Sequence, residues 1–197
     1  MNDFAHVLGL IAGIFTIAGY IPYIYEVIAK TDVPSRASWI IWSLSTLIIL
    51  FGVKATGTHE AIWVPITDAL GCFVIMLLSI KYGVGGWNRA DKISFSLCIL
   101  SLVILWTTGN ALTALIMNLL IYISGYISTI KKAIEDPTTE SKTAWSLFLI
   151  GVVLNFITVA IGSDRGFAVW LYPSVLVICV GVLFTILFRK PKQRVIW

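Results

Sequence analysis

One carboxylic acid lies inside an otherwise apolar stretch of this sequence, and it is the residue best suited to chemistry. Asp68 stands in the segment WVPITDALGC. An unpaired carboxylate in hydrocarbon costs several kcal/mol, so such a residue usually marks a solute pathway, a proton relay or a buried partner. The segment therefore predicts a functional acid, and a buried carboxyl group that gains and loses a proton is the first chemistry to consider.

Three further polar side chains are expected at the depth of Asp68. At 1.5 Å per residue, Asp68 lies roughly 10 Å inside its apolar segment, and Asn118, Asn155 and Ser174 lie seven or eight residues inside theirs. Polar groups in lipid seek internal partners, so a common layer predicts a polar interior that binds a solute. For each asparagine taken alone, a hydrogen bond to the backbone of a neighbouring helix is an equally good interpretation.

Enzymatic chemistry finds no support in the sequence. The cysteines Cys72, Cys98 and Cys179 lie on three separate apolar segments without metal-ligand spacing, and His6 and His59 have no cluster of partners. No glycine-rich phosphate loop follows a strand, and no nucleophile has an evident base. We therefore expect neither an enzyme nor a protein with a metal or another cofactor, and interpret the cysteines as small buried apolar residues.

The elements that must position Asp68 are hydrophobic helices. Apolar residues make up 58% of the chain, charged residues make up 12%, and the mean hydropathy is +0.93, which is far from the usage of soluble domains. A helix of about 20 apolar residues crosses a bilayer core of roughly 30 Å. We expect an all-α integral membrane protein with seven transmembrane helices, of which the fourth is the shortest. The predicted spans are residues 4–29, 37–56, 61–81, 93–107, 110–131, 143–162 and 166–188.

Orientation follows from the positions of Lys and Arg, because cytoplasmic loops hold an excess of them. With the N-terminus outside and the C-terminus cytoplasmic, twelve of the 14 Lys and Arg residues are cytoplasmic, and only Lys54 and Arg165 are outside. The positive charge is divided among four cytoplasmic segments, so it indicates contact with anionic lipid and not with nucleic acid. We expect a multi-pass protein of a cell membrane, with a bacterial inner membrane as the predicted location.

One stretch of the sequence occurs twice. Gly19 to Ile21 recurs as Gly125 to Ile127, an offset of 106 residues, and Trp39 recurs as Trp145. Copies in the same membrane orientation need a linking helix, so the expected plan is three, one and three helices, with solute sites between the halves. The predicted units are a first triple-helix repeat at residues 1–82, a loop and linker helix at 83–108, a second repeat at 109–189 and a basic tail at 190–197.

The tryptophans divide by depth. Trp39 and Trp145 open predicted helices, where indoles accumulate at the membrane–water interface, and we interpret them as members of such an interfacial belt. Trp42 lies about a turn deeper and matches Phe148 in the repeat. Trp42 is therefore the candidate aromatic wall of a solute site, and packing against lipid or the helix core is the alternative.

Three residues near the predicted cytoplasmic side are candidates for a hinge or a gate. Pro22 removes a backbone hydrogen bond and bends or loosens the first helix, whereas the second copy has Ser128 at this position. Glu26 and Lys132 are related by the repeat and carry opposite charges, which would suit a gate. The simpler interpretations are a static bend and solvated charges at helix ends.

With these features, the chain resembles the PQ-loop superfamily, which includes the SWEET sugar facilitators, the half-size SemiSWEETs and lysosomal amino-acid exporters. The resemblance rests on Gly19, Pro22, Ser35 and Trp39, with a short charged loop between them. The signature Pro-Gln pair reads Pro-Tyr in the first copy and Ser-Thr in the second. The plan of three, one and three helices is also similar to that of the PnuC-type vitamin transporters.

The resemblance implies a transporter or facilitator for a small polar metabolite, such as a sugar, an amino acid or an amine-bearing solute, that works by alternating access. It places Asp68 where sugar facilitators carry a pocket asparagine and where related exporters use an aspartate for proton coupling, while Leu176 takes the matching place in the second copy. The acid favours a cationic or proton-coupled solute over a neutral sugar. The alternative is a receptor or sorting protein, since a peptide-retrieval receptor shares this fold, but an acidic and amidic layer favours transport. The sequence leaves the oligomeric state open.

Overall fold

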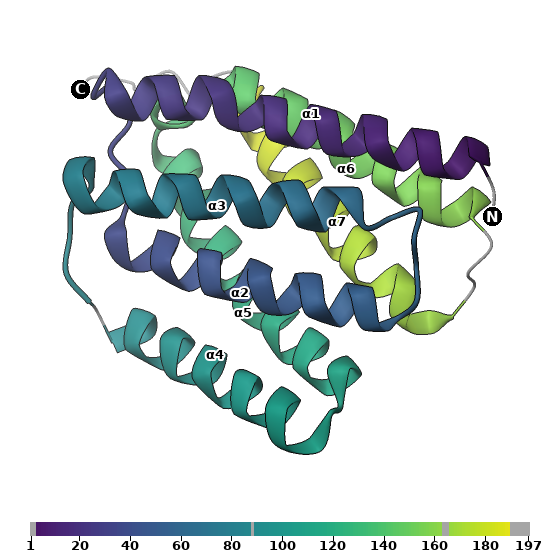
Figure 1. Cartoon of the computed structure of the whole chain (residues 1–197). Coiled ribbons are helices and arrows are strands. Elements are labelled where there is room, and N and C mark those ends of the chain that lie inside the picture. Colours follow the sequence, from purple (N-terminus) through teal and green to yellow (C-terminus); the bar gives the residue numbers. More distant parts are fainter. Residues whose placement is uncertain (1–2, 88, 163–165, 190–197) are drawn as a thin grey trace, which may run out of the picture.

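The computed structural model describes residues 3–87, 89–162 and 166–189. Over these residues the chain forms seven α-helices and one short 3-10 helix, and consecutive α-helices run in alternating directions (Figure 1). Arg165 and the predicted basic tail lie outside the described residues. In chain order the helices are α1 Asp3–Ile28, α2 Arg36–Ala55, α3 Trp63–Tyr82, α4 Arg89–Thr108, α5 Ala111–Glu135, η1 Pro137–Thr139, α6 Lys142–Ile161 and α7 Phe167–Leu187.

The helices have the surface of a membrane protein. Six of those described are long and apolar enough to cross a membrane, and α5 has a shorter apolar stretch at Ala111–Ile127. The exposed face of α1 is a continuous apolar stripe at helical spacing, whereas polar residues such as Thr16 are buried. This arrangement suits a lipid solvent, because lipid accepts apolar side chains and leaves polar groups to pair inside. The residues of the stripe are Val7, Leu10, Ile14, Ile17 and Ile21.

Helix α4 is longer than its apolar pattern predicts. The expected span was 93–107, but the helix begins at Arg89 and has 20 residues. Its first turn contains Asp91 and Lys92, which are compatible with a helix yet end a hydropathy window. The expectation that this helix is the shortest is wrong, since α2, α3 and α6 also have 20 residues.

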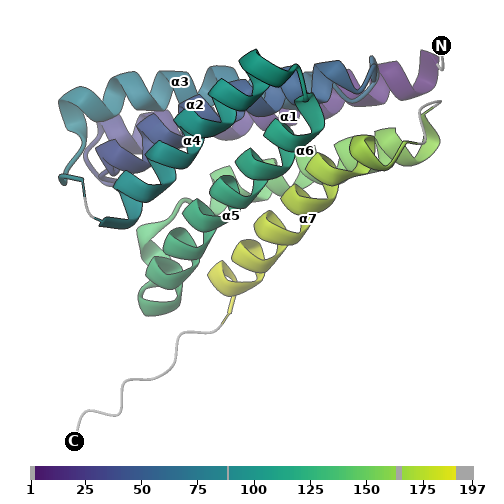
Figure 2. The ribbon, with the colours of Figure 1, turned by 90° about the horizontal axis from the view of Figure 1, so that it is seen from below.

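We call helices α1–α3 the first triplet and helices α5–α7 the second triplet. Helix α3 packs against α1 and α2, and α7 packs against α5 and α6. Between the triplets, α1 packs along α6 and α2 packs along α5. The sequence repeat pairs α1 with α5 and α2 with α6, so these two contacts are equivalent. Helix α4 packs against α5 and α2, and Figure 2 shows α5 and α7 inclined to the layer of α1–α3.

One end of the molecule, which we call the closed end, is tightly packed. Gly9 and Gly13 let α1 approach the start of α3, and a Cβ atom on Gly13 would lie 3.0 Å from the Cβ of Trp63. Beside this contact, Ala61 and Val159 form a buried apolar cluster with Val169. The closed end therefore joins α1, α3, α6 and α7 through close contacts.

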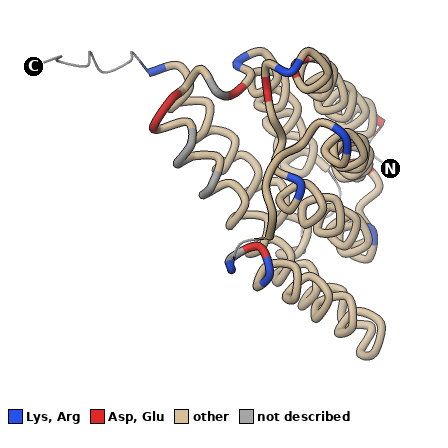
Figure 3. The backbone as a smooth tube through the Cα atoms, turned by 90° about the vertical axis from the view of Figure 1, so that its left-hand side faces the viewer, with Lys and Arg blue, Asp and Glu red and all other residues tan. Residues whose placement is uncertain are grey.

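The opposite end, which we call the basic end, carries most of the Lys and Arg residues of the described chain, and Figure 3 looks toward it. Helices α2 and α6 both begin here with a serine cap: the Ser38 and Ala144 backbone N–H groups donate to Ser35 Oγ at 3.4 Å and to Ser141 Oγ at 3.3 Å. The Val84 backbone N–H donates to the Pro34 carbonyl at 3.0 Å and ties the loop after α3 to the start of α2.

Candidate functional site

A cavity of about 250 Å³ lies between the two triplets. Its lining begins at Val33 and Val84 in the loops of the basic end and reaches Thr16, Asp68 and Leu176 deep in the bundle. Asp68 lies 14 residues before the end of α3 at Tyr82, which is roughly 21 Å at 1.5 Å per residue. The cavity therefore reaches well into the bundle from the basic end and stops before the closed end.

Three tyrosine hydroxyls surround the carboxylate of Asp68, which is 6% exposed. Tyr20 of α1 donates to Oδ1 at 2.5 Å, and Tyr122 of α5 and Tyr172 of α7 donate to Oδ2 at 2.8 Å and 3.3 Å. Asp68 itself comes from α3, so four helices from both triplets meet at one side chain. Three O–H donors directed at two oxygens suit the ionised form, which only accepts hydrogen bonds.

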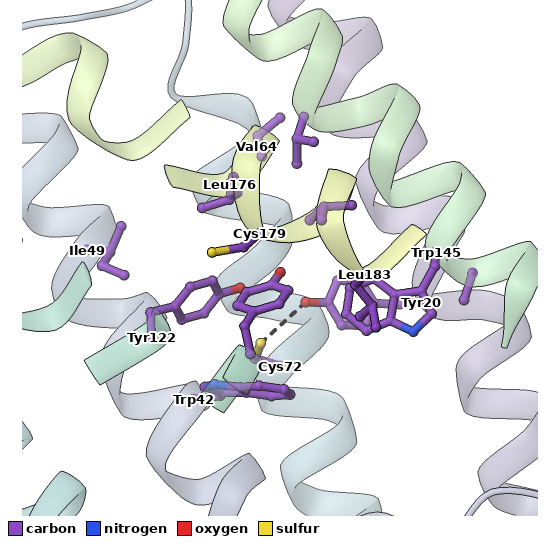
Figure 4. Packing of buried hydrophobic residues seen from close by; sticks show 14 of the residues in the cluster. Tyr20, Trp42, Ile49, Val64, Cys72, Tyr122, Trp145, Leu176, Cys179 and Leu183 are labelled. Carbon is purple, nitrogen blue, oxygen red and sulfur yellow. Dashed lines mark hydrogen bonds between the residues drawn. The ribbon is translucent and has the colours of Figure 1, made fainter. Parts of the chain in front are cut away.

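The other groups near this carboxylate can exchange protons or hydrogen bonds, but they carry no positive charge. The sulfur of Cys72 lies 3.3 Å from the Tyr20 hydroxyl oxygen, and Figure 4 shows Tyr20, Tyr122, Trp42 and Cys72 gathered from different helices. Tyr126 and Cys179 belong to the same buried cluster. A carboxylate whose partners are all neutral has no counter-charge beside it, so it can accept a proton or pair with another cation.

Eight aromatic side chains form a nearly closed ring around the cavity, which we call the aromatic belt. Successive members have ring centroids 4.8 to 6.1 Å apart, and the ring starts on α1, continues over α6, α5 and α2, and returns to α1. All eight line the cavity. In order, they are Tyr20, Phe148, Trp145, Tyr126, Tyr122, Trp42, Trp39 and Tyr23.

Two glycines, one in each triplet, allow rings of the aromatic belt to pack closely against the opposite triplet in equivalent ways. A Cβ atom on Gly19 of α1 would lie 2.6 Å from the ring of Phe148 on α6. A Cβ atom on Gly125 of α5 would overlap the indole of Trp42 on α2. The offset of 106 residues that relates Gly19 to Gly125 also relates Trp42 to Phe148. Each triplet therefore places one aromatic ring directly on a glycine of the other.

The structure brings two of the five predicted solute-binding residues to the cavity. Asp68 and Trp42 line it, with Trp42 9% exposed. Asn118 is buried but donates to Ser101 Oγ of α4 at 2.6 Å and to the Ala114 carbonyl at 2.9 Å. This amide therefore joins α5 to α4 through a side-chain hydrogen bond, whereas the simpler interpretation of the asparagines proposed the backbone of a neighbouring helix as the partner.

Asn155 and Ser174 are not among the described residues that line the cavity. Asn155 is on the same face of α6 as Phe148 and Val152, one turn nearer the closed end. Its amide oxygen and nitrogen are buried with no hydrogen-bond partner among the described residues. Ser174 is half-buried on α7.

The hinge and gate candidates lie at or near the basic end. Helix α1 continues through Pro22 to Ile28 without a break. The backbone carbonyl of Glu26 accepts hydrogen bonds from the Thr31 and Asp32 backbone N–H groups, at 3.0 and 3.2 Å, and so closes the turn after α1. Lys132 belongs to α5, but its side chain lies outside the described part of the structure.

Trp39 and Trp145, interpreted from the sequence as members of an interfacial belt, are only 7% and 6% exposed and line the cavity. The tyrosines around Asp68 were also missed, since a tyrosine in an apolar segment resembles an ordinary core residue. The available signal was the repeat itself, which places Tyr20 opposite Tyr126 beside the paired glycines.

Among the described residues, no group of three or more His, Cys, Asp or Glu side chains is placed to hold a metal ion. Comparison of the chain with models of protein families, with curated proteins and with solved structures finds no match. The site therefore has to be interpreted from its own geometry.

Proposed function

We propose that this protein is a membrane transporter for a small polar solute and that it works by alternating access. In this proposal the two triplets are the moving halves, α4 links them, and the basic end faces the cytoplasm. The observation that supports it best is the cavity, which lies between the triplets, extends from the basic end and ends at a buried carboxylate. Solute sites between repeated halves are typical of such transporters.

In the proposed cycle, the described arrangement is the state open at the basic end. The opposite state requires the contacts between the triplets at the closed end to separate, above all Gly9 of α1 beside Thr158 of α6 and Ala61 against Val159. The α1–α6 and α2–α5 contacts would serve as the surfaces over which the halves rock. Pro22 is the proposed site of bending within α1, because a proline weakens its helix locally.

Asp68 is the proposed coupling residue. Its partners come from α1, α5 and α7, so a change of its charge alters contacts in both halves at once. Protonation would remove the negative charge and weaken the three phenol hydrogen bonds, since bonds to a charged acceptor are the stronger ones. Proton binding would thereby shift the balance between the two states.

Accessibility of one cavity residue from the two sides of the membrane tests this proposal without knowledge of the solute. Thr16 lines the deep part of the cavity, and Thr16→Cys is a small change. In a variant whose three native cysteines are replaced, a membrane-impermeant maleimide should label this cysteine from either side of oriented vesicles. Labelling from the basic side alone would contradict alternating access and would favour a receptor.

Two exposed threonines provide matched controls for sidedness. Thr113 lies near the start of α5 at the closed end, and Thr138 lies in η1 at the basic end. Thr113→Cys should be labelled only from the closed side and Thr138→Cys only from the basic side. These two controls establish vesicle orientation and reagent impermeability before Thr16→Cys is interpreted.

A further inference from the structure

The charges of the cavity select against anionic solutes. Among the described residues that line it, Asp68 and Glu140 are the charged side chains, and both are buried, at 6% and 8% exposed. Glu140 Oε2 accepts a hydrogen bond from the indole N–H of Trp145 at 3.0 Å. A solute with a carboxylate would enter beside two acids without a basic side chain from these residues to pair with it. An amino acid is therefore a poor fit.

Several polar groups deep in the cavity are already paired, which disfavours a sugar. The Thr16 hydroxyl donates to the Ala12 carbonyl at 3.0 Å, and the Thr129 hydroxyl donates to the Gly125 carbonyl at 3.3 Å. Both oxygens of Asp68 already accept from tyrosines. Each sugar hydroxyl that lost water without gaining a partner would weaken binding. A polyol therefore finds these hydroxyl and carboxylate groups already engaged with the protein.

The aromatic belt offers what a cation with apolar substituents needs. Ring faces attract a cation, most strongly in indole and most effectively where water is excluded. Trp42 and Tyr122 have ring centroids 6.1 Å apart, and Tyr122 also donates to Asp68. A positive group near Asp68 would therefore lie close to aromatic rings as well as to the carboxylate.

We propose that the solute is a small organic ammonium cation without a carboxylate, whose charge pairs with Asp68 and whose apolar substituents contact the aromatic belt. The claim that this cation is transported rests on the proposed transport function, whereas the claim that it binds in this cavity does not. The cavity of about 250 Å³ is smaller than the roughly 300–1,000 Å³ of sites for drug-sized ligands, so a compact alkylammonium ion suits it.

Calorimetric titration of the purified full chain in detergent tests this inference with three probes. Choline carries a quaternary ammonium group; dimethylbutanol has the same shape with carbon in place of nitrogen; glycine betaine keeps the ammonium group and has a carboxylate in place of the alcohol. We expect choline to bind, and the other two to bind at least about tenfold more weakly. Equal affinity for choline and dimethylbutanol, or failure of choline to bind, would overturn the inference. This comparison needs no substitution.

Matched variants assign the binding to the cavity. Asp68→Asn and Trp42→Leu should each weaken choline binding by about tenfold or more. Glu60→Gln changes an acid that is buried near the closed end, and Trp106→Leu changes an indole that is 89% exposed on α4; both should leave choline binding unchanged. If the two cavity variants bind choline like the parent while remaining folded, the site is not this cavity.

Failure of the substrate class and failure of transport give different results. Choline binding that depends on Asp68, combined with labelling of Thr16→Cys from the basic side alone, would support a cation-binding receptor and contradict transport. Labelling from both sides without charge-selective choline binding would support transport and contradict the cation.

Discussion

Because Trp42 packs directly on Gly125, we predict how much a methyl group at position 125 lowers the stability of the interface between the triplets. In Gly125→Ala, the new methyl group would overlap the indole of Trp42. The indole cannot easily swing away, because it also packs against Trp39 and Tyr122. Either the indole shifts against these rings or helices α2 and α5 move apart, and overpacking of this kind costs about 1–3 kcal/mol.

Gly181→Ala in α7 is the matched control, since a Cβ atom there would have no heavy atom within 4 Å. In a helix interior, alanine is about 0.8–1.0 kcal/mol more favourable than glycine, and both variants gain this term. Gly125→Ala should therefore be about 1–3 kcal/mol less stable than Gly181→Ala.

Thermal unfolding followed by circular dichroism in one detergent measures the difference. For a chain of this size, 1 kcal/mol corresponds to roughly 2–4 °C in Tm, so the melting temperatures should differ by at least about 2 °C. Gly19→Ala, which meets Phe148 at the equivalent contact, should behave like Gly125→Ala. Equal melting temperatures for Gly125→Ala and Gly181→Ala would show that Trp42 does not rest on Gly125.

Three further predictions concern coupling and helix packing. A pH step should change the labelling rate of Thr16→Cys several-fold when Asp68 is present and should leave that rate unchanged in Asp68→Asn. The measurement is the rate of maleimide labelling at two pH values, corrected for the rate of a model thiol. Asn118→Leu, which removes the hydrogen bond to Ser101, should lower stability by about 0.6–2 kcal/mol while choline affinity in the same titration stays constant. Ser141→Ala removes the cap of α6 and should cost about 1 kcal/mol of unfolding free energy; an unchanged melting temperature would contradict the capping role.

Hydropathy predicted where the helices lie because a helix that crosses the hydrocarbon core of a membrane must be apolar along its length. The segment predicted at 37–56 is α2 Arg36–Ala55, and that at 143–162 is α6 Lys142–Ile161. The ends of α4 and α5 were harder, since these helices continue into charged residues that favour helix but end an apolar window. Helix α5, for example, extends to Glu135, four residues past its predicted end.

Depth located Asp68 but not the other members of the site. Residues at one depth can point in different directions: Ser174 is two positions from Tyr172 and two from Leu176, which is about 200° around the helix in each case. Tyr172 donates to Asp68 and Leu176 lines the cavity, whereas Ser174 does not line it. The depth of a polar residue also does not show which partner it has. Asn118, for example, pairs with Ser101 of α4 instead of facing a solute.

The aromatic belt could not be predicted from the sequence for a different reason. Tryptophan and tyrosine occur at membrane interfaces, in helix cores and in solute sites alike, so residue type alone does not distinguish these positions. The distinction comes from the contact between triplets, where Gly19 and Gly125 admit Phe148 and Trp42. Only the packing of both triplets shows that these rings face a cavity.

The central claim is that the cavity opens in turn to the two sides of the membrane, and labelling of Thr16→Cys from the closed side tests it most directly. The account predicts that an impermeant maleimide added on that side modifies this cysteine, although the described arrangement opens at the basic end. Complete protection from that side, in vesicles where Thr113→Cys is labelled, would contradict it.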